Sequence, residues 1–167
     1  MATATRRLGE VLIERGLVKA WQLDAALQTQ RTTKEFLGTI LVKKGWLTEA
    51  ALLSGLAEQF NMPHVHVTAD DVDWQVAGKY SPALLTEHHC LALRCDGRSV
   101  TVAIANPLDA WAISELEQRA GVRALQLVLA SAEEIQEAIR VCHQRALRAL
   151  NNQIKRASGE GSPDRGL

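Results

Sequence analysis

The sequence predicts an α+β fold, in which a helical N-terminal subdomain precedes a small α/β subdomain. Two observations carry this prediction. A segment of 24 residues recurs after a shift of 29 positions, and both copies have the apolar spacing of helices. After Gln59 this spacing gives way to short alternating runs, which are typical of strands. We therefore expect subdomains over about residues 6–61 and 62–150, with a disordered tail over 151–167.

Each copy of the repeat predicts a short helix, a glycine turn and a longer helix. The first copy spans residues 7–30 and reads RLGEVLIERGLVKAWQLDAALQTQ, with Gly16 placed to end its short helix. The second copy spans residues 36–59 and reads FLGTILVKKGWLTEAALLSGLAEQ, with Gly45 in the same place. Thr48 is suited to cap the longer helix of this copy. Residues 31–35 are expected to form a polar linker.

The second half predicts strands and helices in alternation. Residues 63–67 alternate and suggest a short strand, and Ser81 with Pro82 opens a short helix. Strands at residues 89–95 and 99–105 flank a hairpin turn at Gly97. A helix then runs from residue 109 to about 119, a strand covers 124–129, and a long amphipathic helix follows Ser131.

Composition excludes several classes of protein. The chain has 167 residues, and its 19 basic and 19 acidic residues balance, which argues against a protein that coats DNA or RNA. No apolar run approaches the roughly 18 residues of a membrane span, and the N-terminus lacks a secretory signal. Three cysteines without CxxC spacing suggest reduced thiols. We expect a cytoplasmic protein without membrane insertion.

Signatures of catalysis are missing from the sequence. There is no phosphate-binding P-loop, nucleophile elbow, zinc-protease motif or CxxC pair, so we expect a non-enzyme without catalytic residues. A zinc site could gather histidines and cysteines, but no pair has the usual ligand spacing, so we expect no metal. The residues weighed for it are His64, His66, His88, His89, Cys90, Cys142 and His143.

The repeat carries groups suited to a nucleotide. Gly9 and Gly38 lack a Cβ, so a planar ligand or another helix can approach the helix closely. Arg7 can bind a phosphate or guanine, and the amide of Gln30 can bind a base edge or the backbone. Two copies suit a symmetric ligand with two bases and two phosphates. The alternative is a duplicated helical hairpin that packs on itself.

Both copies resemble the paired 24-residue motifs of the MshEN domain, the N-terminal domain of type II secretion and type IV pilus assembly ATPases. The first copy matches every motif position, and the second matches most of them. The matching residues are Arg7, Leu8, Gly9, Leu12, Ile13, Gly16, Leu17, Val18, Leu23, Leu27 and Gln30, then Leu37, Gly38, Leu41, Val42, Gly45, Trp46, Leu47, Leu52, Leu56 and Gln59. Residues 81–88 and 103–109 also resemble the domain, so the resemblance covers roughly residues 6–145.

This resemblance implies binding of cyclic di-GMP, one motif for each half of the ligand, with no other cofactor. It also implies a protein partner in secretion, pilus or related envelope machinery. The ligand-binding residues that it implies are Arg7, Leu8, Gly9, Leu23, Leu27, Gln30, Phe36, Leu37, Gly38, Leu52, Leu56 and Gln59. The α/β half is expected to add Asn106 or Asp109, and the sequence leaves both open.

Two departures from the family pattern affect these expectations. Phe36 stands where the second motif has a basic residue, and losing one charged partner costs about 1.5–3 kcal/mol of binding, unless Arg31 or Lys34 replaces it. The sequence also lacks the ATPase domain, so it is either a separate receptor module or a piece of a larger ATPase. The alternative function is a ligand-free adaptor that docks through Trp21, Trp46 or Trp111.

Overall fold

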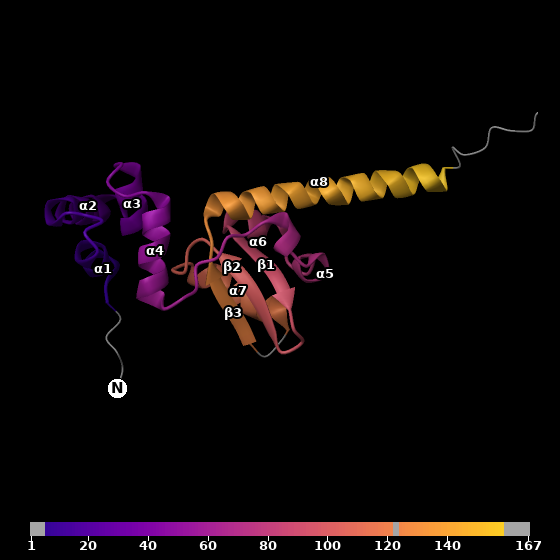
Figure 1. The fold of residues 1–167 in the computed structure, drawn as a ribbon, viewed down its shortest axis with the longest axis horizontal. Helices are drawn as coiled ribbons and strands as arrows, with labels where there is room; N and C mark the ends of the chain where they lie inside the picture. Colours follow the sequence, from indigo (N-terminus) through magenta and orange to yellow (C-terminus); the bar gives the residue numbers. More distant parts are fainter. Residues whose placement is uncertain (1–5, 122–123, 159–167) are drawn as a thin grey trace, which may run out of the picture.

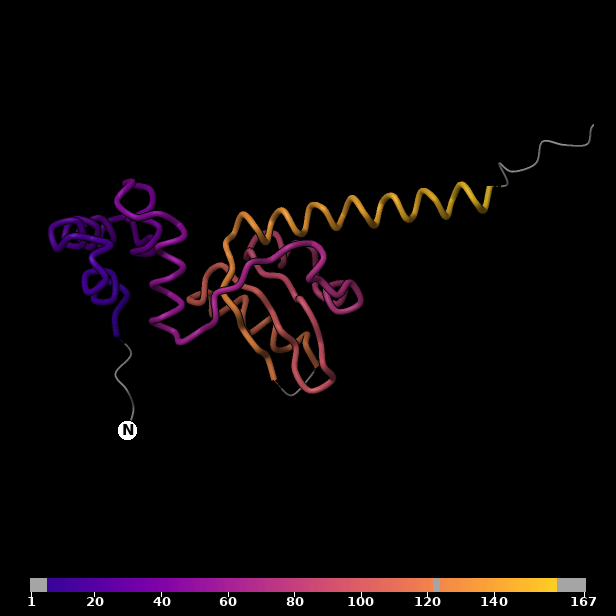
Figure 2. Tube along the Cα trace, in the orientation of Figure 1, coloured from indigo at the N-terminus to yellow at the C-terminus, as the bar shows by residue number. Residues whose placement is uncertain are grey.

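The computed structural model describes residues 6–121 and 124–158. A helical N-terminal half, an α/β body and a long C-terminal helix follow one another along the molecule (Figure 1). The predicted α+β fold class is confirmed. The trace in Figure 2 shows that the last helix of the N-terminal half stands between the other repeat helices and the α/β body.

The N-terminal half consists of four helices, two from each copy of the repeat. These are α1 (Leu8–Glu14), α2 (Ala20–Thr33), α3 (Leu37–Lys43) and α4 (Glu49–Phe60). Gly16 and Gly45 follow the short helices with φ of +67° and +70°, a conformation that disfavours residues with a Cβ. The Thr48 hydroxyl accepts a hydrogen bond of 3.2 Å from the Ala51 N–H and caps α4 as predicted.

Glycines at the start of the short helices let the helices of each repeat pack closely. A Cβ added at Gly38 would lie 2.5 Å from Leu52 Cδ1, and one at Gly9 would lie 2.9 Å from Leu23 Cδ1. Each opening glycine therefore receives a leucine from the longer helix of its own copy. A shared core then forms between the copies from Leu12, Val18, Ala26, Ile40, Leu41 and Leu47.

The α/β body is built on one three-stranded sheet in the order β1-β2-β3. Strands β1 (Cys90–Cys95) and β2 (Ser99–Ile104) form the predicted hairpin, with φ of +83° at Gly97. Strand β3 (Ala124–Leu129) pairs parallel to β2 after the crossover helix α7 (Ala110–Ala120). The helices η1 (Ala69–Asp71), α5 (Trp74–Ala77) and α6 (Pro82–Glu87) precede the sheet, and α8 (Ala132–Ala157) follows it.

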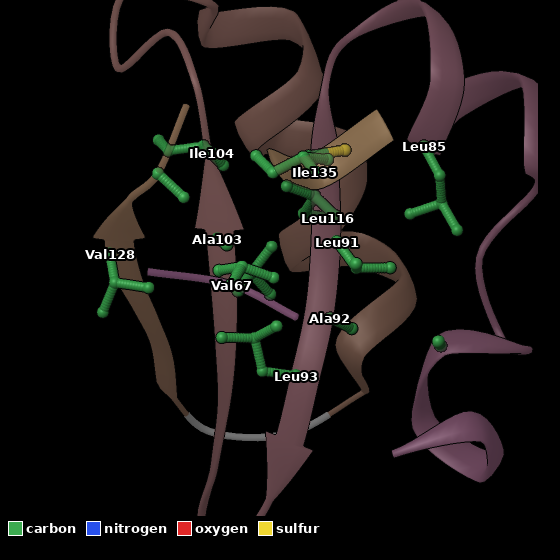
Figure 3. Packing of buried hydrophobic residues seen from close by; sticks show 14 of the residues in the cluster. Val67, Leu85, Leu91, Ala92, Leu93, Ala103, Ile104, Leu116, Val128 and Ile135 are labelled. Carbon is green, nitrogen blue, oxygen red and sulfur yellow. The ribbon is translucent and has the colours of Figure 1, made fainter. Parts of the chain in front are cut away.

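The main core lies between the sheet and the helices of the body. Figure 3 shows Leu91 of β1, Leu116 of α7 and Ile135 of α8 gathered beside the strands. All three are almost fully buried. Leu56 of α4 belongs to the same core, so the repeats are anchored to the body by apolar packing.

Three boundaries differ from the sequence predictions. Residues 63–67 do not form a strand; His64 makes an isolated bridge to Leu129 of β3. The linker predicted over 31–35 is shorter, because α2 continues to Thr33 and ends at Lys34 with φ of +61°. The tail predicted from residue 151 is wrong over 151–157, because α8 continues to Ala157; residues 159–167 lie outside the described residues. Of the helices described, none has the length and apolarity to cross a bilayer.

Candidate functional site

A cavity of about 240 Å³ lies where the repeats meet the α/β body. All four repeat helices, or the segments joining them, contribute to its wall, and the loop after β2 completes it. The lining residues are Leu8, Gln30, Phe36, Leu37, Gly38, Thr39, Leu52, Leu56, Gln59, Ala105, Asn106 and Leu108. Nine of the fourteen residues expected at the ligand site are therefore brought together.

The second copy of the repeat supplies most of the wall. Leu52 of α4 sits against Gly38 of α3, so the glycine sets how closely the two helices approach at this point. Leu56, one turn further along α4, is 6% exposed and joins the core of the α/β body. A ligand that contacts Leu56 therefore touches a residue that links both halves.

The two glutamines that end the repeats have unequal surroundings. The Gln30 Nε2 donates a hydrogen bond of 3.0 Å to the Glu35 carbonyl, which fixes the chain just before α3 begins. The side chain of Gln59 makes no hydrogen bond to any residue that the structure describes, although it is partly buried and lines the cavity. The Gln59 amide therefore has donor and acceptor capacity left for a ligand.

Phe36 stands at the mouth of the cavity. It is the residue that caps the start of α3, and 51% of its surface is exposed. Such an exposed ring can stack on a flat base. Arg31 and Lys34, which could replace the missing basic residue, are both exposed and lie within five residues of it in sequence.

The loop after β2 places its two candidate ligand-binding residues, Asn106 and Asp109, differently with respect to the cavity. Asn106 lines the cavity, and its Oδ1 accepts a hydrogen bond of 3.0 Å from the Leu108 N–H. Asp109 is not part of the cavity wall, because it caps α7 through the Ala112 N–H at 3.0 Å and contacts His88 Nδ1 at 2.7 Å. Partial burial alone would raise the pKa of Asp109, but these two partners outweigh burial and lower it. Asp109 therefore holds the loop that presents Asn106.

The remaining expected residues of the first copy do not line this cavity. Leu23 fills the space beside Gly9, and Leu27 is 37% exposed on α2. Arg7 is exposed, and its backbone N–H donates to Glu10 Oε2 at 3.0 Å. The guanidinium of Arg7 makes no ion pair within residues 6–121 and 124–158. The two copies are thus structurally alike but unequal in what they contribute.

Three lining residues were not expected from the sequence: Thr39, Ala105 and Leu108. The repeat alignment could not single out Thr39, because its counterpart in the first copy is Glu10. Ala105 and Leu108 belong to residues 103–109, for which the sequence indicates a resemblance to the family but assigns a ligand-binding role only to Asn106 or Asp109. A search for residues flanking the polar Asn106 would have included both.

Other hollows and groups of charged side chains are weaker candidates for a ligand site. A larger hollow of about 700 Å³ lies between η1 and α8, and most of its charged lining residues are already paired, such as Arg145 with Asp70 at 2.7 Å. His66 likewise contacts Glu134 at 2.7 Å. Within the described residues, no group of three or more His, Cys, Asp or Glu side chains could hold a metal ion. The cavity between the halves is therefore the strongest candidate site.

The sequence is similar to one protein family and to two type IV pilus ATPases. Residues 60–149 match the family model of the MshEN domain. The type IV pilus assembly ATPase PilB of Myxococcus xanthus is 29% identical over 133 residues, covering 80% of this chain and 23% of the relative. PilB of Thermus thermophilus is 27% identical over 119 residues, covering 70% of this chain and 13% of the relative. The chain thus spans less than a quarter of the length of either relative.

Solved structures agree with these matches. A structure of MshE with cdg, or cyclic di-GMP, superposes with a TM-score of 0.71 at 26% identity, covering 81% of this chain and 97% of that one. The N-terminal domain of XpsE superposes with a TM-score of 0.64 at 23% identity, covering 80% and 92%. At that identity the second likeness concerns the fold alone.

Proposed function

The chain belongs to the MshEN domain family, and from this premise we propose that it is a cytoplasmic regulatory module that binds cyclic di-GMP. The observation that carries the proposal is the cavity in which both repeats and the loop after β2 meet. Binding, rather than catalysis, is the proposed activity. The proposed setting is type II secretion or type IV pilus machinery, where its relatives PilB act as assembly ATPases.

The size of the cavity suits one half of the ligand. Sites that enclose a whole drug-sized molecule have about 300–1,000 Å³, and this cavity has about 240 Å³. One guanine can therefore lie inside, against Leu52 and Leu56, while the rest of the dinucleotide lies across the mouth. Phe36 would stack on a base there, and Gln59 and Asn106 would bind base edges.

The charge for the phosphates would come from outside the cavity. Arg7 immediately precedes Leu8, which lines the wall, and its guanidinium has no ion-pair partner in the described part of the chain. A flexible arginine at this position can reach a phosphate at the mouth and bind it with two hydrogen bonds. Leu23 and Leu27 would then face the second base, so the first copy would serve the exposed half of the ligand.

Occupancy can be transmitted because the ligand would touch both halves of the molecule. Leu56 lines the cavity and also belongs to the core of the α/β body. A base held between Leu56 and the Asn106 loop would restrict how the repeats move against the body. This restriction is the proposed signal to a partner protein.

Calorimetric titration with cyclic di-GMP tests the proposal. We expect saturable binding by the wild type, and about 2- to 10-fold weaker binding by Gln59→Leu, since one neutral hydrogen bond is lost. Gln28→Leu is the matched control, because Gln28 is exposed on α2 outside the cavity wall. Absence of saturable heat, or equal weakening by both variants, would contradict the proposed site.

A ligand-free adaptor is the second candidate function, and an aromatic pair with one exposed and one partly exposed member favours it. The rings of Trp21 and Trp46 meet edge to face at 5.3 Å, and Trp21 is 58% exposed. Trp111 is equally exposed but lies against the His88 ring at 4.7 Å, on the α/β body. Capture of a pilus or secretion protein that Trp21→Ala abolishes, and that cyclic di-GMP leaves unchanged, would favour the adaptor.

A further inference from the structure

The C-terminal part of α8 extends away from the body with an uncovered apolar stripe. Every residue from 143 to 158 is exposed, and Figure 1 shows this part of the helix running beyond the sheet and α6. Leu147, Leu150 and Ile154 are 60%, 53% and 55% exposed. Their spacing of three and four residues places them on one side of the helix. Because these three side chains leave apolar surface in water, the segment gains free energy from a partner that covers them.

The charges around the stripe indicate the kind of partner. Taking Leu147 and Leu150 as heptad positions a and d, the flanking e and g positions are uncharged; they hold Gln144, Ala146, Asn151 and Gln153. The arginines and lysine of the projecting segment fall at outward positions b, c and f; they are Arg145, Arg148, Lys155 and Arg156, of which Arg145 pairs with Asp70. Two copies of this segment can therefore pack together without like charges meeting beside the seam.

The same pattern argues against a lipid surface as the occupant. Helices that lie on anionic membranes bury a broad apolar face that carries Trp, Phe or Leu. Here the stripe consists of Leu147, Leu150 and Ile154, amides border it, and residues 143–158 contain no Trp, Tyr or Phe. The apolar stripe is also narrow, as in a coiled-coil seam.

We propose that α8 pairs with α8 of a second copy of this chain in an antiparallel two-helix contact. In this arrangement positions a and d alternate across the seam, so Leu147 meets Leu150 of the second copy, and His143 meets Ile154. All four layers are generated by one two-fold axis, so the interface is self-complementary.

An apolar hollow on the body extends this seam. A space of about 220 Å³ between α5, α6 and α8 is lined in part by Trp74, Leu85, His143 and Ala146. Trp74 is 44% exposed there. Because His143 belongs to both the hollow and the seam, Ile154 of the second copy would lie at the mouth of the hollow. The contact then covers Trp74 as well as the stripe.

Sedimentation of the full chain over a wide concentration range tests the association. Because the seam is short, we expect a weak dimer, with the mean mass rising from 18.3 kDa toward twice that value at roughly 100 µM and above. The variant Leu150→Gln with Ile154→Gln should remain monomeric, whereas Arg148→Gln with Asn152→Ala, on the outward face, should associate like the wild type. A wild type that stays monomeric, or a dimer that the seam variant leaves intact, would overturn the proposal.

Disulfide trapping tests the direction of the helices. With Cys95→Ser to remove the partly exposed thiol, His143→Cys and Ile154→Cys proteins are mixed and oxidised. Antiparallel pairing predicts a mixed disulfide between them, because two Ile154→Cys residues would lie about 16 Å apart along the seam. Disulfide formation by Ile154→Cys alone would indicate parallel pairing and overturn the proposed arrangement. Binding to anionic phosphatidylglycerol vesicles without dimer formation would assign the stripe to lipid instead.

Discussion

The packing of Leu52 against Gly38 gives a prediction that a double-mutant cycle can measure. In Gly38→Ala, the new methyl group would lie 2.5 Å from Leu52 Cδ1 and 3.0 Å from Cδ2, so Leu52 has to move. Overpacking of this kind costs about 1–3 kcal/mol of unfolding free energy. Replacing a helical glycine by alanine returns up to about 1 kcal/mol. We expect Gly38→Ala to destabilise the protein by about 0–3 kcal/mol.

Removing Leu52 should remove the clash. Leu52→Ala alone is expected to cost about 2 kcal/mol, at the low end for leucine because the side chain is partly exposed. In the double variant the alanine at position 38 no longer meets a leucine, so its helical gain remains without the overpacking. The double variant should therefore be about 1–3 kcal/mol more stable than the two single effects predict. Urea unfolding followed by circular dichroism measures all four proteins.

The result that would refute this reasoning is additivity. If the free energy of unfolding of the double variant equals the sum of the single effects within about 0.5 kcal/mol, Gly38 is not needed to admit Leu52. Gly45→Ala is a useful comparison, because an added Cβ there meets nothing within 4 Å and the φ of +70° alone is responsible. It should destabilise by about 1–2 kcal/mol, and Leu52→Ala should not alter that cost.

Three further predictions concern the α/β body. Cys95 is partly exposed, whereas burial raises the pKa of the Cys90 thiol to about 12 and leaves Cys142 only 1% exposed. A thiol reagent at pH 8 should therefore modify one cysteine in the native protein and all three in urea. The pKa of Asp109 is lower in the folded protein than its ordinary value of 3.8, so the ionised carboxylate stabilises the fold at pH values above 3.8. This stabilisation is lost as the pH falls through the lowered pKa of the folded state. Asp109→Asn should therefore lose less stability than the wild type below about pH 5, in acid titrations followed by circular dichroism. Ile135→Ala should cost about 2–5 kcal/mol in urea unfolding, because the side chain is fully buried.

Much of the fold could be predicted because local rules determine it. A glycine with positive φ ends a helix or turns a hairpin wherever it occurs, and Gly16, Gly45 and Gly97 all have positive φ. Strand β3 was predicted with its observed bounds because a short apolar run was flanked by turn residues. These signals need only neighbouring residues, which a single sequence contains.

The structure differs from the sequence predictions where contacts between residues far apart in the sequence determine the local structure. Among the described residues, His64 forms a single bridge, to Leu129, 65 positions away, and alternation alone does not distinguish such a bridge from a strand. The division between Asn106 and Asp109 depends on His88, which takes up the Asp109 carboxylate. The unequal surroundings of Gln30 and Gln59 depend on the chain before α3, where the Glu35 carbonyl occupies only the first amide. Spacing within a motif contains none of this information.

The most direct test of the proposed function is a calorimetric titration of cyclic di-GMP into the wild type and Phe36→Arg. Phe36 stands at the mouth of the cavity, where the family motif has a basic residue. The added guanidinium should bind a phosphate, and its planar face can stack on a base in place of the phenyl ring. Saturable binding is therefore expected for both proteins, with about 10- to 100-fold higher affinity in the variant. Absence of saturable binding to both would contradict the proposal that this cavity is a cyclic di-GMP site.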